Sequence, residues 1–192
     1  ILAESMALWD LTITLQIAEA LLTGIVTDTI GFRTSNMNPQ ALRIAADLME
    51  YGANLPDIYE RSLAQRSFEA ARYWGKGLSS LQREGRLIWA TLSRADRRAV
   101  GYNSNDDADL NHILSTIVQG DISVLFIEQN KHHVKVSWRA RPGWDVSQLA
   151  LKFGGGGHPA AAGAEIFGTM EEVQDLVLEA TKQLLSDHSQ GK

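Results

Sequence analysis

The run of four consecutive glycines from Gly154 to Gly157 restricts the fold of this chain more than any other sequence feature. Glycine has no Cβ atom, so it adopts positive φ without strain and lets backbone N–H groups come close to a bound group. Successive N–H groups in such a turn form a concave site for an anion. The run therefore predicts either a flexible loop or a phosphate-binding loop, and the neighbouring residues must decide between them.

The residues that follow the glycine run favour phosphate binding. His158 comes directly after it, and an imidazole can donate a hydrogen bond to a phosphate oxygen. Pro159 suits the first position of a short helix and Gly163 its end, so we expect a helix whose positive N-terminal dipole faces the glycine loop. The run is neither a P-loop, because no Lys-Ser/Thr pair follows it, nor a dinucleotide fingerprint, because a predicted helix precedes it.

Hydrophobic patterns on both sides of the run predict an α/β layer. The expected elements, in chain order, are a strand at 87–92, a helix at 108–118, a buried apolar strand at 122–127, a strand at 133–139, a short helix at 145–152 and a strand at 164–167. Alternation in the strand at 133–139 places Trp138 in the core and turns Arg139 outward. A last amphipathic helix is expected to turn one face inward, formed by Val173, Leu176, Val177, Ala180 and Leu184.

The first half of the chain has helical periodicity. Apolar residues recur at spacings of three and four at Ile17, Ala18, Leu21, Leu22 and Ile25, and again at Ala41, Leu42, Ala45, Leu48 and Met49. We therefore expect two helices joined by a polar turn at 27–39. The helical pattern already covers 5–22 without a cap, and the first residue is Ile1, so we expect that an upstream segment has been removed. Residues 56–81 favour helix again, and beyond about Gly85 the pattern changes to strands alternating with helices.

Charge and composition exclude several classes of protein. A net charge of −5 argues against a protein that coats long nucleic acid by charge alone. Residues 61–98 hold nine basic and three acidic residues, which we interpret as solvated faces, whereas the basic residues of 131–152 surround the strand that carries Arg139. The sequence has no cysteine, no long apolar run and no export signal. We therefore predict a cytoplasmic protein with no membrane partner.

Residues 152–163, preceded by Val136-Ser137-Trp138-Arg139, resemble the DHH-associated C-terminal domain of DHH-family phosphoesterases. The similarity is to the NrnA-type bifunctional oligoribonucleases and phosphoadenosine-phosphate phosphatases, which are relatives of RecJ nucleases. This resemblance implies that the glycine loop, its histidine and the arginine of the preceding strand hold the substrate's phosphate and terminal nucleotide. The matching positions are Gly155, Gly156, Gly157, His158 and Arg139.

The segment at 23–29, followed by 32–36, resembles the last metal-binding motif of the same family and implies that Asp28 is a metal ligand. The usual glycine after Asp-Thr is Ile30 here, with Gly31 one place later. The residues alone favour a different role for Asp28, as a capping or turn aspartate at a helix end.

The family uses two metal ions, usually manganese, which upstream motifs including Asp-His-His help to hold. None of these motifs occurs in this sequence, and the adjacent His132 and His133 lie at the start of a strand, where we expect them to face solvent. A single carboxylate cannot hold a hard divalent ion against water. We therefore expect the chain to retain manganese poorly and to be inactive by itself.

The resulting expectation is an α/β fold in three parts: a helical remnant of the DHH domain at 1–66, a helical connector at 67–85, and a smaller C-terminal α/β domain with a mixed sheet at 86–192. The resemblance implies a metal-dependent phosphoesterase that hydrolyses phosphodiester or phosphomonoester bonds of short RNA or DNA oligonucleotides or nucleotides. This chain would mainly bind the substrate. Trp144 and Phe153 are candidates for stacking on a base, with core packing as the alternative.

Two other functions stay open from the sequence. One is a nucleic-acid-binding or dimerisation module like that appended to alanyl-tRNA synthetases, and the other is a phosphodiesterase for cyclic or linear dinucleotides. A homodimer is compatible with each of them.

Overall fold

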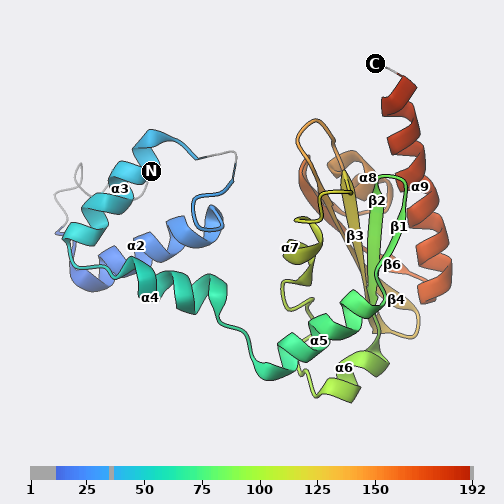
Figure 1. Ribbon diagram of the computed structural model, residues 1–192, viewed down its shortest axis with the longest axis horizontal. Coiled ribbons are helices and arrows are strands. Elements are labelled where there is room, and N and C mark those ends of the chain that lie inside the picture. The colour runs from blue at the N-terminus through green and yellow to red at the C-terminus, as the bar shows by residue number, and fades with distance from the viewer. Residues whose placement is uncertain (1–11, 35–36, 191–192) are drawn as a thin grey trace. The chain divides into compact units, whose positions relative to one another are not determined.

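The computed structural model describes residues 12–34 and 37–190, which divide into two compact units (Figure 1). Unit 1 ends at Arg66 and unit 2 begins at Ser67. Within these residues, no helix combines the length and the apolar character that crossing a bilayer requires.

Unit 1 is a small helical assembly. Its elements are α2 (Leu15–Asp28), α3 (Pro39–Glu50), α4 (Leu55–Tyr59) and the π-helix η1 (Glu60–Ala64). Thr14, Asn38 and Asn54 cap the three α-helices, because each side-chain oxygen accepts a hydrogen bond from an amide three residues on. The buried core consists of Ala18, Leu22, Val26, Ala45, Leu48, Ala53 and Ile58.

The two predicted N-terminal helices are confirmed, but the first does not run unbroken over 5–22, because residues 12–14 are not helical. The helix begins at Leu15 behind the Thr14 cap, and residues 5–11 of the predicted helix lie outside the described residues. The stretch at 56–81 that favours helix is interrupted between the two units, because η1 ends at Ala64 and the next helix starts only after Ser67.

Unit 2 contains a mixed sheet, as the sequence predicted. Its elements are α5 (Phe68–Ser79), β1 (Gln82–Glu84), β2 (Leu87–Leu92), α6 (Arg94–Val100), α7 (Leu110–Leu114), β3 (Ile122–Asn130), β4 (His133–Ala140), α8 (Ser147–Lys152), β5 (Gly156–His158), β6 (Ala161–Phe167) and α9 (Met170–Gln190). The strand order is β1-β2-β3-β4-β6-β5. Strands β2 and β3 are parallel, and the other neighbours pair antiparallel.

Several boundaries differ from the sequence prediction for local reasons. The helix expected at 108–118 is only α7, because Ala108 and Asp109 have φ of 49° and 63°, which a right-handed helix cannot contain. Helix α6 was missed, although Ser93 and Asp96 form a capping box at its start. Helix α5, in the segment predicted as a connector, packs Tyr73 into the core of unit 2.

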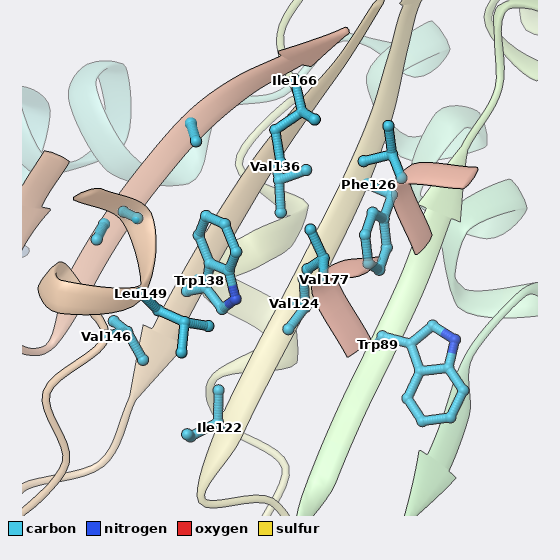
Figure 2. Close-up of a cluster of buried hydrophobic side chains, with 14 of the residues drawn as sticks. Trp89, Ile122, Val124, Phe126, Val136, Trp138, Val146, Leu149, Ile166 and Val177 are labelled. Carbon is cyan, nitrogen blue, oxygen red and sulfur yellow. The ribbon is translucent and has the colours of Figure 1, made fainter. Parts of the chain in front are cut away.

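Helices α8 and α9 cover one face of the sheet, which we call the closed face. Its buried side chains on the strands are Leu87, Trp89, Ile122, Val124, Phe126, Val134, Val136, Trp138, Ala162, Ala164 and Ile166. Figure 2 shows Trp138 among Val124, Leu149 and Val177. The predicted core position of Trp138 is confirmed, because this side chain is 0% exposed. In α9, Leu176 is 59% exposed and does not join the inward face that the sequence predicted.

The opposite face of the sheet, which we call the open face, is covered only in part. Helices α5, α6 and α7 pack over β2 and β3, and α7 lies on the opposite side of the sheet from α9 (Figure 1). Over β4, β6 and β5 this face carries Lys135, Ser137, Arg139, Ala161, Gly163, Glu165, Gly156 and His158. These residues are half-buried or exposed, so this part of the face is accessible.

Candidate functional site

One row across the sheet brings the two predicted phosphate-binding side chains to the same face. Ser123 pairs with Arg139, Arg139 with Ala161, and Ala161 with His158. Directly paired residues point to the same side of a sheet, so Arg139 and His158 both project from the open face. With strands about 4.8 Å apart, their backbones are about 10 Å from one another, a gap that a long arginine side chain and an imidazole can share.

A second row beside it has almost no side chains. Ser137 pairs with Gly163, and Gly163 with Gly156. A Cβ atom at Gly156 would meet no atom within 4 Å, whereas one at Gly163 would lie 3.1 Å from the Val136 carbonyl oxygen. The two rows together make a floor of bare backbone bordered by a guanidinium and an imidazole.

The short helix predicted at 159–163 is wrong, because these residues form the turn and second strand of the hairpin β5–β6. Backbone hydrogen bonds from residues outside the hairpin hold this turn: the Ala140 amide donates to the Ala160 carbonyl at 2.9 Å, and the Val146 amide donates to the Pro159 carbonyl at 2.9 Å. Pairing of β6 with β4 outweighs the helix propensity of the alanines. The expected helix dipole is therefore absent, and β5 is instead an edge strand of the sheet that the described residues form.

Two of the other glycines are required by packing. A Cβ atom at Gly155 would lie 2.1 Å from the Gly163 carbonyl oxygen, and one at Gly157 would lie 2.5 Å from the Ala161 carbonyl oxygen. Gly157 also has φ of 145°, which side chains rarely allow. Gly155 and Gly157 thus let β5 lie close against β6, while Gly156 serves no such purpose.

Arg139 is half-buried and already oriented. Its Nη1 donates to the Trp138 carbonyl at 3.0 Å, which holds the guanidinium against the strand. It borders a small cavity of about 30 Å³ together with Ser123, Ser115 and Asp121.

The loop before α7 lies near the same face and contributes an acidic group. Burial works to raise the pKa of Asp106, but hydrogen bonds from Ser104 and Tyr102 outweigh it, and the charge of Lys135 adds to them, so this pKa is lowered. Asp106 is therefore ionised near neutral pH and offsets part of the charge of Lys135, which pairs with Glu165 in the next row of the open face.

In unit 1, Asp28 is the exposed last residue of α2, and a strained turn follows it. The Thr29 hydroxyl organises the turn, because it donates to the Ile25 carbonyl at 2.6 Å and accepts from the Phe32 amide at 2.9 Å. Ile30, Gly31 and Phe32 have φ of 49°, 66° and 68°. A β-branched residue rarely adopts this conformation, so Ile30 is strained at the position where the resembled motif has glycine.

The residues around Asp28 do not complete a metal site. In 12–34 and 37–190, no three His, Cys, Asp or Glu side chains gather in a way that could hold an ion. Hard divalent ions need several oxygen or imidazole ligands. The described residues therefore do not fit a pair of metal ions by themselves, and Asn36 of the resembled motif lies outside them.

The remaining candidates have structural roles. His132 is exposed as predicted, but His133 is half-buried, stacks on Phe167 at 4.9 Å and has Nε2 2.7 Å from Glu165 Oε2, so its predicted solvent-facing position is wrong. Phe153 stacks on Trp138 at 6.1 Å, and both Phe153 and Trp144 pack against the closed-face core, which supports core packing over base stacking.

Sequence reasoning missed two buried polar residues close to the open face. Ser123 on β3 and Asn111 on α7 are 4% and 1% exposed, and their side-chain polar atoms have no hydrogen-bond partner among the described residues. The sequence could have indicated Ser123, because this residue is the one polar side chain in the otherwise apolar run from Ile122 to Ile127.

Comparison with known proteins places these features in a family context. Residues 99–187 match the model of the DHHA1 domain. The chain is 36% identical over 176 residues to the bifunctional oligoribonuclease and PAP phosphatase NrnA of Thermus thermophilus, covering 90% of this chain and 52% of that protein. It is 26% identical over 175 residues to the protein of the same name from Bacillus subtilis, covering 89% and 53%.

A solved structure agrees with the fold of the chain. An exopolyphosphatase-related protein from Bacteroides fragilis is 27% identical, with a TM-score of 0.81 over 92% of this chain and 51% of that chain. The chain thus spans about half the length of the relatives it matches.

Proposed function

Residues 99–187 match the DHHA1 domain and the chain is similar to the NrnA-type DHH phosphoesterases, and from this similarity we propose that unit 2 binds the phosphate and terminal nucleotide of a short oligonucleotide or nucleotide. Arg139, His158 and the backbone of Gly155, Gly156 and Gly157 form the binding surface. We propose further that the whole enzyme hydrolyses phosphodiester or phosphomonoester bonds of such substrates and acts in the cytoplasm. The relatives named oligoribonuclease and PAP phosphatase support the hydrolytic part of this proposal.

Gly156 carries this proposal. Its Cβ would meet no atom of the protein within 4 Å, so the fold itself does not require a glycine there. Glycine in a strand costs conformational entropy and gives no packing in return, and a close approach by a ligand is one reason to tolerate it. Gly156 lies two residues before His158 on β5, in the row next to the one that holds Arg139 and His158, so a phosphate over its open side would be close to the imidazole and within reach of a fork of N–H donors.

The part played by this chain is recognition and positioning. The Arg139 guanidinium offers paired donors to phosphate oxygens, and its hydrogen bond to the Trp138 carbonyl fixes its direction before the ligand arrives. Preorganised donors of this kind hold a substrate in a reactive geometry. The resemblance assigns Asp28 to a metal pair, for which we propose manganese, and we expect negligible turnover from this chain when manganese is added.

Binding of a 5′-phosphorylated dinucleotide such as pApA tests the proposal. Isothermal titration calorimetry on the 192-residue chain should show that Arg139→Ala weakens the affinity by roughly ten- to a hundredfold, because a charge-assisted hydrogen bond contributes about 1.5–3 kcal/mol. Arg83→Ala, at an exposed arginine of the opposite edge strand β1, is the matched control and should bind like the wild type.

Equal affinity of the wild type and Arg139→Ala would remove the assignment. The changes in backbone amide chemical shifts when pApA is added locate the binding site, and they should be largest at residues 155–158 and 139. Preference for transfer RNA over dinucleotides would instead favour a nucleic-acid-binding module.

A further inference from the structure

Phe167 is the most exposed large hydrophobic side chain among the described residues, with 83% of its surface open to solvent. It ends β6 and pairs in register with His133 at the start of β4. The two rings stack with their centroids 4.9 Å apart and their planes 15° from parallel. One side of the Phe167 ring is therefore backed by an imidazole, and the rest of the ring is open. Phe167 belongs to neither hydrophobic core of unit 2, so its exposed ring adds little to the packing of this unit.

The stacked rings lie on the same face of the sheet as the proposed phosphate site. Alternation along β4 places every second side chain on the open face, namely His133, Lys135, Ser137 and Arg139. On β6, Phe167 faces the same side as Ala161, which stands between Arg139 and His158 in the register. Six residues of strand separate His133 from Arg139, which is about 20 Å at roughly 3.4 Å per residue. One accessible face thus carries the proposed phosphate site near one end of β4 and an aromatic surface at the other.

The charges between these two ends do not favour a second phosphate. Lys135 pairs in register with Glu165, and its charge also interacts with Asp106. Two carboxylates therefore offset one ammonium in this part of the face. A strand held by its phosphate at Arg139 meets no net positive charge as it passes along β4. The group that suits the aromatic end is the uncharged base, because every base has a flat face that stacks on an aromatic ring.

We propose that Phe167, backed by His133, is a stacking subsite for a base further along the oligonucleotide whose phosphate Arg139 and His158 hold. Successive phosphates of a stacked strand are about 3.4 Å apart along its axis, so about 20 Å corresponds to roughly six nucleotides, and to fewer in an extended strand. A dinucleotide is too short to reach this subsite, whereas a strand of several nucleotides gains a contact there. The inference rests on the proposed function and deepens it, because it assigns a place to a base beyond the terminal nucleotide.

The test measures the affinity of 5′-phosphorylated oligoadenylates of two to six nucleotides for the 192-residue chain by calorimetry. The wild type should bind the hexamer roughly five- to twentyfold more tightly than pApA, because it gains one stacked base. Phe167→Ala should bring the ratio of the two affinities to about one, and Phe167→Tyr, which keeps a ring, should preserve the ratio of the wild type. Leu176→Ala is the matched control, since this exposed leucine lies on α9, which covers the closed face.

A second measurement does not depend on any variant. A hexamer that lacks the bases beyond its second nucleotide keeps all of its phosphates and loses the groups that stack, so the wild type should bind it like pApA. Three results would each overturn the subsite: equal affinity of the wild type for pApA and the intact hexamer, an unchanged ratio in Phe167→Ala, or equal affinity for the two hexamers.

Sedimentation of the free protein provides a further check. A dimeric wild type that becomes monomeric in Phe167→Ala would also overturn the subsite, because the ring would then belong to a contact between two copies of the chain. All of these outcomes leave the proposed function standing. Failure of both pApA and the hexamer to bind, or binding that ignores Arg139→Ala, sinks the proposed function itself.

Discussion

The closed and open faces of the sheet in unit 2 use the same strands and treat polar groups in opposite ways. On the closed face, the buried indole N–H of Trp138 donates to the Thr181 hydroxyl at 3.2 Å, and Thr181 donates in turn to the Val177 carbonyl at 2.7 Å. On the open face, the Ser123 hydroxyl is buried without a partner among the described residues. A satisfied polar group is explained by the fold, whereas an unsatisfied one points to a ligand or solvent group that completes it.

Two adjacent glycines, Gly155 just before β5 and Gly156 at its start, differ in the same way. The space that a Cβ atom would need at Gly155 is taken up by β6, which pairs with β5. The same space at Gly156, on the open face, is empty. The comparison separates a glycine that the packing of the hairpin requires from one for which that packing gives no reason.

The largest expected effect comes from the closed face. Trp138→Ala removes a fully buried aromatic side chain and should lower the free energy of unfolding of unit 2 by about 3–5 kcal/mol. Chemical denaturation followed by circular dichroism measures this loss. Phe167→Ala, at an aromatic side chain that is 83% exposed, is the control and should change the stability by less than about 1 kcal/mol. Similar losses in both variants would show that the closed face is not the main core.

The next effect separates the two neighbouring glycines. Gly155→Ala should cost about 2 kcal/mol of stability, because the new Cβ would lie 2.1 Å from the Gly163 carbonyl oxygen and the hairpin would have to shift. Gly156→Ala should leave the free energy of unfolding within about 0.5 kcal/mol of the wild type. It should nevertheless weaken pApA binding on the order of tenfold, since the methyl group would occupy the floor of the site. Calorimetry with pApA and chemical denaturation of both variants measure these two effects. Binding of pApA by Gly156→Ala as tight as that of the wild type would contradict the explanation of this glycine by a ligand.

Much of the fold of unit 2 follows from periodicity. The strand at 87–92 and the alternation that buries Trp138 were predictable, because both depend on local patterns of apolar residues. The segment at 159–163 was not, since Pro-Ala-Ala-Ala-Gly favours a helix locally and only pairing with β4 makes it a strand. The helix at 108–118 failed for a local reason that sequence does not display, namely the positive φ of Ala108 and Asp109.

The candidate site was predictable in its members but not in its arrangement. Arg139 and His158 could be chosen from the motif, yet their common face depends on strand register, which a single sequence does not determine. Ile30 shows the converse: the missing glycine was visible in the sequence, and the structure adds that Ile30 carries the strain, with φ of 49°. Whether the motif residues bind a nucleotide stays a prediction.

The smallest expected effects have opposite signs on the two faces. Thr181→Val should destabilise the protein by about 1 kcal/mol, because it leaves the Trp138 indole N–H buried without an acceptor. Ser123→Ala should instead leave the stability unchanged or raise it by up to about 1 kcal/mol, because it removes a buried hydroxyl that has no partner to lose. Thermal unfolding of both variants in the absence of nucleotide measures the difference. A loss in Ser123→Ala as large as that in Thr181→Val would mean that Ser123 is satisfied within the protein, and the distinction between the two faces would then fail.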